Sequence, residues 1–383
     1  MDRKPYLKKV KRAVVKIGSG VLTRKNGLNL NLIDDITTEI CKLRKKGIEI
    51  ILVSSGAIAA GLKKAGLSRR PDSLSQMQAL AAMGQSSLIM AYEEAFARHA
   101  AQCAQILLTR DDLTHRRRYL NARNTLITLL SWGIIPIINE NDTVVVDEIK
   151  FGDNDNLSAM VTNLTGSQFL VNLTNIDGLY DSDPRHDKDA RLIKFVDKID
   201  RKLSRAAGSI PGFLGTGGMA SKLAAAKNVS LGGVPSVIAS GLNPGVLKEI
   251  FAGKTIGTFF KPREIPLNSK KQWIAFTKSP SGEITIDGGA EKALLTNGKS
   301  LLPSGIVKVL GRFSMGSAVV LKNGAGKDIA VGLVNYSSDD LQQIKGARTS
   351  AIETILGYKH DDEVIHRDNL VPTSMLADEP DLD

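Results

Sequence analysis

Short polar side chains gather in two clusters whose amides and carboxylates could bind a small charged molecule. The first cluster, Asn-Glu-Asn-Asp at residues 139–142, directly follows the apolar run 134–138, which we predict to be a buried strand. The second cluster, Gly-Asp-Asn-Asp-Asn at residues 152–156, precedes a helix that we expect to open at Leu157. Because Asn and Asp are also common in turns and helix caps, one cluster alone would indicate little. Two clusters that flank a predicted pair of short strands, residues 143–146 and 148–151, favour a binding site.

Lys16 and two glycine-containing turns could bind anionic groups. Lys16 lies near the end of the apolar run 13–17, where a buried ammonium is costly unless it meets an opposite charge. The turn Ser-Ser-Gly-Ala-Ile at residues 54–58 could direct backbone N–H groups at an anion, although an ordinary helix cap is the alternative. The glycine-rich segment 212–222 precedes an alanine-rich helix, so its N–H groups and helix dipole would suit phosphate. This segment lacks the P-loop pattern, and a surface loop without a ligand is the alternative.

Strands and helices alternate from residue 13 to about residue 250. We predict strands at residues 13–17, 48–53, 105–108, 134–138, 169–173 and 236–239, and helices at 32–43, 73–98, 120–132 and around 247. This alternation predicts an α/β fold in which an open, mostly parallel sheet is sandwiched by helices. Polar segments at Gly18, Ser55, Asn139 and Thr174 each follow a strand. They should therefore meet at the carboxyl edge of the sheet, where such sheets bind ligands.

The sequence pattern changes after about residue 260. We predict a first domain at residues 1–260, a Pro- and Lys-containing linker at 261–273, a small, mainly β domain at 274–360, and an acidic, mobile tail at 361–383. Strand-like segments at 282–286, 306–309, 317–321 and 329–334 are separated by glycine turns. The chain is therefore expected to contain one large and one small domain.

Composition points to a globular cytoplasmic protein. The chain has 383 residues, of which 42% are hydrophobic, and no apolar run is long enough to suggest a membrane span. Two cysteines suggest neither a disulfide framework nor a zinc site. A net charge of +11 could attract nucleic acid or small anions. With only 5% aromatic residues, the chain shows no stacking stretch of the kind expected for binding single strands.

Five motifs together resemble one family. The motifs are VKIGS at residues 15–19, VSSGAIAAG at 53–61, INEND at 138–142, FGDNDNLS at 151–158 and GTGGM at 215–219. In this order they resemble the glutamate 5-kinases of the amino-acid kinase superfamily, and the C-terminal part resembles a PUA domain. The resemblance covers nearly the whole chain apart from about the last twenty residues.

The resemblance implies an enzyme that uses ATP and Mg²⁺ to phosphorylate the γ-carboxylate of L-glutamate, the first step of proline synthesis. It also implies feedback inhibition by proline and a homo-oligomer, either a dimer or a tetramer. The PUA-like part leaves nucleic acid as an alternative partner, which we do not expect, and no membrane association is expected. A kinase of the same fold acting on another small acid is a second alternative, against which the intact motifs at 139–142 and 152–156 argue.

The resemblance also assigns roles to particular residues. It implies that Lys16, Lys222 and Asp155 are catalytic, and that Ser55, Asp142 and Asn154 bind glutamate. The implied nucleotide-binding residues are Lys16, Thr174, Asn175, Thr216, Gly217, Gly218, Met219, Ala220, Ser221 and Lys222. The family commonly has Thr-Asp where this chain has Thr174-Asn175, so the nucleotide contact there is in doubt. We assign no metal ligand, because magnesium usually keeps several waters.

Overall fold

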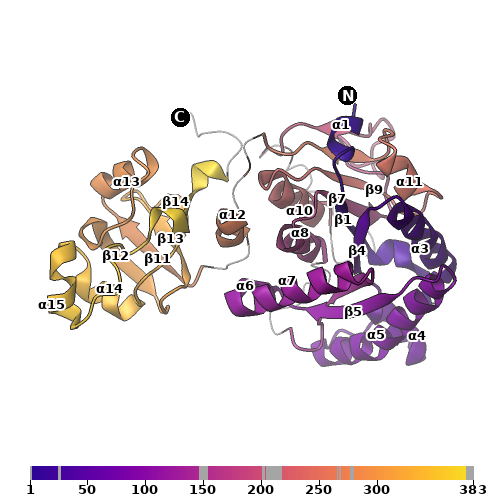
Figure 1. The fold of residues 1–383 in the computed structure, drawn as a ribbon, viewed down its shortest axis with the longest axis horizontal. Helices are drawn as coiled ribbons and strands as arrows, with labels where there is room; N and C mark the ends of the chain where they lie inside the picture. Colours follow the sequence, from indigo (N-terminus) through magenta and orange to yellow (C-terminus); the bar gives the residue numbers. More distant parts are fainter. Residues whose placement is uncertain are drawn as a thin grey trace. The chain divides into compact units, whose positions relative to one another are not determined.

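The computed structural model describes residues 2–24, 27–145, 154–200, 203, 218–264, 266, 269–276 and 280–376 (Figure 1). The chain separates into two compact units, Met1–Pro266 and Leu267–Asp383, and each unit has its own sheet. Among the described residues, no helix combines the length and hydrophobicity needed to cross a membrane.

The first unit is built on a sheet whose eight strands follow the order β5-β6-β4-β1-β7-β9-β10-β8. These strands are β1 (Arg12–Ile17), β4 (Glu49–Ser54), β5 (Cys103–Leu108), β6 (Ile135–Glu140), β7 (Phe169–Thr174), β8 (Phe195–Val196), β9 (Ser236–Ser240) and β10 (Thr258–Phe260). The strands from β5 to β9 in this order run parallel, β10 is antiparallel to β9, and β8 is parallel to β10. The short strands β2 (Thr23–Arg24) and β3 (Gly27–Leu28) form a separate pair.

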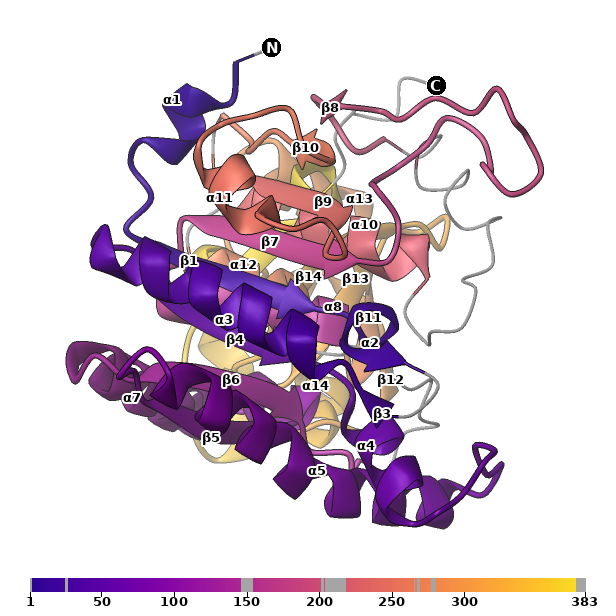
Figure 2. The same ribbon diagram turned by 90° about the vertical axis from the view of Figure 1, so that its right-hand side faces the viewer.

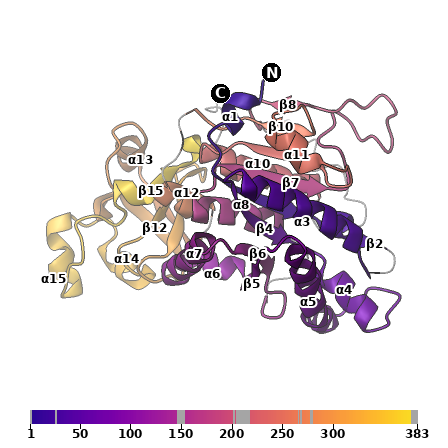
Figure 3. The same ribbon diagram turned by 45° about the vertical axis from the view of Figure 1, so that its right-hand side comes forward.

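Helices cover both faces of this sheet. They are α1 (Lys4–Leu7), α2 (Ser19–Leu22), α3 (Leu30–Lys45), α4 (Ala57–Lys64), α5 (Leu74–Ala97), α6 (Arg110–Thr114), α7 (Arg116–Ser131), α8 (Asn154–Thr165), α10 (Met219–Leu231) and α11 (Val246–Phe251). Helices α3, α5 and α11 pack in one hydrophobic cluster, and α7, α8 and α10 pack in another. Figures 1 and 3 show α3 and α11 on one side of the central strands and α8 and α10 on the other, and Figure 2 views the sheet with α3 in front.

The alternation of side chains along β1 decides which face receives its lysine. Successive residues of a strand point to opposite faces. Val15 packs in the cluster of α3, α5 and α11, whereas Val14 packs in the cluster of α7, α8 and α10. Lys16 has the same parity as Val14, so its side chain points toward α8 and α10. In the sheet, β4 lies on one side of β1 and β7 on the other, so the strand order reverses at β1. Open α/β sheets bind ligands at the carboxyl ends of the strands at such a reversal.

The predicted α/β fold of the first unit is confirmed, with differences in detail. Strand β6 continues through Asn139 and Glu140, and α8 begins at Asn154 rather than at Leu157. The predicted strand at residues 143–146 is wrong for its described part, because residues 142–144 form a turn. The β-branched residues there favour a strand, but in the described part of the chain this segment forms no strand pairing with a neighbour. The predicted strand at 148–151 lies outside the described residues.

The second unit has a sheet of five strands in the order β12-β11-β13-β14-β15. These strands are β11 (Gly282–Ile286), β12 (Ile306–Gly311), β13 (Ala318–Lys322), β14 (Asp328–Leu333) and β15 (Leu370–Pro372), with helices α12 (Ser269–Phe276), α13 (Gly288–Leu295), α14 (Ser338–Ile344) and α15 (Ile352–Leu356). Short 3₁₀ turns are η1 (Pro303–Gly305), η2 (Thr349–Ala351), η3 (Arg367–Asn369) and η4 (Thr373–Met375). Within the described strands of this sheet, only β11 and β13 pair in parallel. The unit has its own hydrophobic core, as predicted for a small, mainly β domain.

Two predictions about the ends of this unit are wrong in part. The predicted linker 261–273 runs into α12, which begins at Ser269 and buries Ile274. The predicted tail 361–383 contains β15, which pairs antiparallel with β14. Four apolar residues of that region are buried, namely Val364, Ile365, Leu370 and Val371. These apolar residues are too few to show a sequence period. They nevertheless contribute to the sheet and core of the second unit, and within residues 364–372 only Arg367 and Asp368 are exposed. Residues 377–383 lie outside the described part.

Candidate active site

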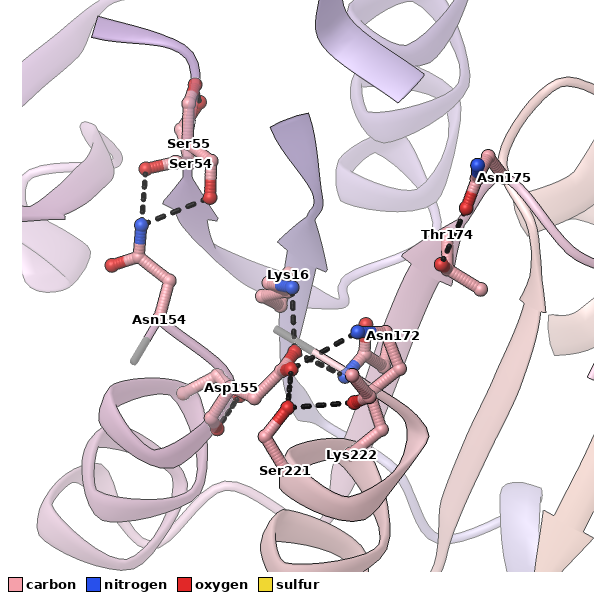
Figure 4. Close-up of polar contacts among 12 residues, drawn as sticks. Lys16, Ser54, Ser55, Asn154, Asp155, Asn172, Thr174, Asn175, Ser221 and Lys222 are labelled. Atoms are coloured by element: carbon pink, nitrogen blue, oxygen red, sulfur yellow. Dashed lines mark hydrogen bonds and ion pairs between the residues drawn. The ribbon is translucent and has the colours of Figure 1, made fainter. Parts of the chain in front are cut away.

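Two buried lysines share one buried carboxylate at the carboxyl edge of the sheet (Figure 4). Lys16 Nζ on β1 lies 2.5 Å from Asp155 Oδ1, and Lys222 Nζ on α10 lies 3.1 Å from Asp155 Oδ2. Asp155 is fully buried, and the two lysines are 4% and 6% exposed. Because one negative charge faces two positive charges, the cluster keeps a surplus positive charge that an incoming anion can neutralise.

The charge of Asp155 is held by its neighbours. Burial alone would raise the pKa of Asp155, but the charges of Lys16 and Lys222 outweigh burial and hold this pKa well below its ordinary value. Burial lowers the pKa of Lys222, and the carboxylate of Asp155 opposes that change. The carboxylate is therefore ionised at neutral pH and fixes the positions of both lysines.

Two further side chains complete the shell around Asp155. Asn172 Nδ2 on β7 donates to Asp155 Oδ1 at 2.8 Å, and Ser221 Oγ donates to Asp155 Oδ2 at 2.6 Å. Ser221 was expected at the nucleotide, so this contact adds a second role in positioning. Asn172 was missed by the sequence analysis. The sequence could have indicated it, because Asn172 is a single amide inside an otherwise apolar strand. A buried amide in such a strand normally has a hydrogen-bond partner.

A second cluster surrounds Asn154, the residue before Asp155 on α8. Asn154 Nδ2 donates to Ser55 Oγ at 2.9 Å, to the Ser54 carbonyl at 3.2 Å and to Asn139 Oδ1 at 3.0 Å. Figure 4 shows Asn154 turned toward Ser54 and Ser55, while Asp155 is turned toward the lysines. Asn154 and Asp155 are the first two residues of α8. Asn154 contacts Asn139 of the other polar cluster predicted from the sequence, and Asp155 contacts the two lysines. Asn154 Oδ1 is buried and has no hydrogen-bond partner among the described residues.

Close packing between α4 and α5 fixes the serine side of this cluster. A Cβ atom at Gly84 would lie 1.8 Å from the Ala57 carbonyl oxygen, and one at Gly61 would lie 1.9 Å from the Leu80 carbonyl oxygen. Only glycine allows these backbones to approach so closely. The hydroxyl of Tyr92, a fully buried residue of α5, lies 3.0 Å from Ser54 Oγ. Tyr92 was not predicted to have a role, because its position on a long, largely apolar helix gives no signal in the sequence.

Asp142 lies at the end of the same region, in the turn that follows β6. It is half-buried, and burial raises its pKa to about 6, although the positive charge of Arg70 lowers it. Gln78 Nε2 on α5 donates to the Val145 carbonyl at 3.1 Å, which ties this turn to α5. Asp142 can therefore change its charge near physiological pH, unlike an ordinary aspartate.

The expected nucleotide-binding residues fall into two groups. Gly218 is the N-cap of α10, and Met219, Ala220 and Ser221 form its first turn. Among the described residues, no side chain caps this helix end. The N–H groups of a helix's first turn and the helix dipole suit phosphate oxygens, and this turn lies directly before Lys222. Thr174 is buried at the end of β7 and donates to Asn175 Oδ1 at 3.3 Å, while Asn175 is exposed. Thr216 and Gly217 lie outside the described residues.

The described residues offer no cluster of three or more His, Cys, Asp or Glu side chains that could hold a metal ion. Both oxygens of Asp155 are occupied by lysine, serine and asparagine donors. The site therefore presents cations, amides and N–H groups. These groups suit the transfer of an anionic group between two anions, where positive charge and positioning supply most of the catalysis.

Comparisons with known proteins agree with this geometry. Residues 11–240 match the model of the amino acid kinase family, and residues 282–356 match that of the PUA domain. The chain therefore belongs to the amino acid kinase family.

Full-length relatives of the chain indicate one particular enzyme of this family. Over 370 residues it is 56% identical to the glutamate 5-kinase of Geobacter sulfurreducens, a match that covers 96% of this chain and 99% of the relative. It is 51% identical over 361 residues to the glutamate 5-kinase of Caldanaerobacter subterraneus subsp. tengcongensis, covering 94% of this chain and 97% of the relative. Among solved structures, UMP kinase from Ureaplasma parvum is 17% identical, with a TM-score of 0.47 and coverage of 66% of this chain and 99% of that chain.

Proposed function

We propose that the protein transfers the γ-phosphoryl group of ATP to the γ-carboxylate of L-glutamate, giving L-glutamyl 5-phosphate and ADP in the first step of proline biosynthesis. The observation that carries this proposal is the pair Lys16 and Lys222 on a single carboxylate, Asp155. Two cations held in this way can reduce the electrostatic repulsion between the acceptor carboxylate and the γ-phosphoryl group, which are both anionic. The names of the relatives select glutamate as the acceptor.

The reaction needs positioning more than proton transfer. The γ-carboxylate is already ionised at neutral pH, so no general base is required. A carboxylate oxygen forms a bond to the γ-phosphorus while the bond from this phosphorus to the β,γ-bridging oxygen breaks. Lys16 and Lys222 stabilise the charge on the transferring and leaving oxygens, and the first turn of α10 holds nucleotide phosphate. Asp155 orients both lysines.

The acceptor is held by the second cluster. We assign the α-ammonium group of glutamate to Asp142, by charge complementarity, with Ser55 and Asn154 as further contacts. Asn154 Oδ1 supports this assignment, because it is buried and has no donor within the described part of the chain. A buried acceptor without a donor is costly, and an ammonium group would satisfy it. Thr174 and Asn175 are assigned to the nucleotide.

Magnesium would be carried by the nucleotide phosphates in this proposal, where it would neutralise phosphate charge. Asp155 has both oxygens engaged, and the described residues supply no carboxylate cluster. We therefore assign Mg²⁺ no protein ligand.

The proposed function is tested by trapping the product. Purified protein with ATP, Mg²⁺, L-glutamate and hydroxylamine should form the glutamyl hydroxamate, because hydroxylamine captures an acyl phosphate. Aspartate and N-acetylglutamate should give none, because the first is shorter and the second lacks the ammonium group. Product with N-acetylglutamate but not with glutamate would contradict the assignment of the acceptor.

Replacing Asp142 with asparagine should raise the KM for glutamate roughly tenfold to a hundredfold, because a charge-assisted hydrogen bond to the ammonium is lost. The KM for ATP should change little. In the wild type, kcat/KM for glutamate should fall as pH drops below about 6, since Asp142 is then protonated. Glutamate's own side chain titrates near about 4.3, so the two effects are separable.

The matched control is Asp35→Asn, which neutralises an exposed aspartate on α3. Its pH profile should coincide with that of the wild type, whereas Asp142→Asn should lose the change near pH 6. Equal increases in both KM values for Asp142→Asn would contradict the role in glutamate binding.

Three properties stay predictions that rest on the family resemblance: inhibition by proline, assembly into a dimer or tetramer, and a cytoplasmic location. We do not expect the second unit to bind nucleic acid. Filter binding of RNA at two salt concentrations would test this expectation, because phosphate-driven binding must weaken steeply as salt rises.

A further inference from the structure

Gln85 ends a chain of hydrogen bonds that begins at Asn154. Asn154 Nδ2 donates to Asn139 Oδ1 at 3.0 Å, and Asn139 Nδ2 donates to Gln85 Oε1 at 2.8 Å. Asn139 and Asn154 are 3% and 5% exposed, so neither amide can exchange these partners freely for water. Gln85 is half-buried on α5.

Two backbone groups fix the direction of every hydrogen bond in this chain. The Ser54 carbonyl can only accept, so the nitrogen of the Asn154 amide must face it. The Glu140 N–H group can only donate, and it lies 2.9 Å from Asn139 Oδ1, so the oxygen of that amide faces Glu140. Asn139 Nδ2 must then face Gln85, which therefore has to act as an acceptor.

The position of Gln85 is itself well fixed. The preceding residue, Gly84, lies where α5 approaches α4 most closely, as its missing Cβ shows. Helix α4 begins just after Ser55, the hydroxyl that also accepts from Asn154. The same pair of helices therefore holds both ends of the network around Asn154.

We propose that Gln85 is a positioning residue for the acceptor amino acid. Acting through Asn139, it holds the Asn154 side chain, and so sets the affinity for glutamate rather than the rate of phosphoryl transfer. This inference rests on the proposed function. Gln85 does not touch the substrate. Its loss would remove the one acceptor that Asn139 Nδ2 has among the described residues and free that side chain to turn away from Asn154.

The test compares Gln85→Met, which keeps the length but has no strong acceptor, with Gln85→Glu, which keeps an acceptor. Gln85→Met should raise the KM for glutamate roughly tenfold, with little change in kcat or in the KM for ATP. Gln85→Glu should restore most of this affinity. Gln76→Met is the matched control, because Gln76 is exposed on the same helix, and its kinetics should match those of the wild type.

A double-mutant cycle shows whether the effect passes through Asn139. In an Asn139→Ala background, Gln85→Met should add little, because the hydrogen bond that it removes is already gone. Full additivity would overturn the inference, as would a Gln85→Met variant that behaves like Gln76→Met. A Gln85→Glu variant as impaired as Gln85→Met would also overturn it.

Crystal structures of the two Gln85 variants give an answer that does not depend on turnover. Asn139 should move away from Asn154 in Gln85→Met and stay in place in Gln85→Glu. An unmoved Asn139 in Gln85→Met would overturn the inference even if the wild type phosphorylates glutamate. A wild type that is inactive with glutamate would instead contradict the proposed function.

Discussion

Replacing Lys222 with alanine is expected to lower kcat by about a hundredfold or more, because one of two preorganised cations at the transferring phosphoryl group is lost. The fold should survive this change. Asp155 would keep Lys16 as its partner at 2.5 Å, so no buried charge is left alone. Steady-state kinetics with saturating ATP and glutamate measure the effect, and the KM for glutamate should change much less than kcat.

The control is Lys227→Ala, which removes a half-buried lysine farther along α10. Its kcat should stay close to that of the wild type, while net charge falls by the same amount. If both variants were equally active, Lys222 would be peripheral to phosphoryl transfer. A Lys222→Ala variant with a raised KM for ATP and unchanged kcat would assign the lysine to ground-state binding of the nucleotide.

Replacing Asp155 with alanine is expected to affect both activity and stability. Lys16 and Lys222 would remain buried without their carboxylate, and breaking a buried ion pair in this way costs about 3–5 kcal/mol. Urea denaturation followed by hydrogen exchange in peptides of β1, α8 and α10 measures the loss in the first unit alone. Activity should fall to near background, because neither lysine keeps its position.

The pH dependence separates this effect from simple loss of packing. The folded-state pKa of Asp155 is lowered, so its stabilisation is complete above the unfolded-state pKa of about 3.9 and disappears as pH falls through the folded-state pKa. The difference in the free energy of unfolding between wild type and Asp155→Ala should therefore be constant near neutral pH and shrink below about pH 4.

The control for this prediction is Asp34→Ala, which removes a partly exposed carboxylate 2.6 Å from Arg98 Nη1. A surface ion pair of this kind contributes about 1 kcal/mol or less. An Asp155→Ala variant no less stable than Asp34→Ala would show that the lysines escape to solvent, and that Asp155 does not hold the cluster together.

Much of the kinase fold could be predicted from the sequence because its signals are local. Apolar runs that alternate with helical patterns predicted the parallel sheet, and the polar residues after these runs predicted its ligand-binding edge. The turn at residues 142–144 and the packed segment 364–372 were not predicted, since β-branched and polar compositions do not reveal whether a segment finds a partner.

Sequence patterns alone predict which residue types stand at the strand ends, and the family resemblance groups Lys16, Asp155 and Lys222 as catalytic residues. The way in which these three side chains are joined depends on the tertiary fold. The parity of β1 turns Lys16 toward α8 and α10, where one carboxylate meets both lysines. Asn172 and Gln85 enter the site through contacts across the fold, 17 and 54 residues from their partners Asp155 and Asn139. Local periodicity carries no information about such contacts, because it reports only which face of a strand or helix is buried and not which distant segment packs against that face.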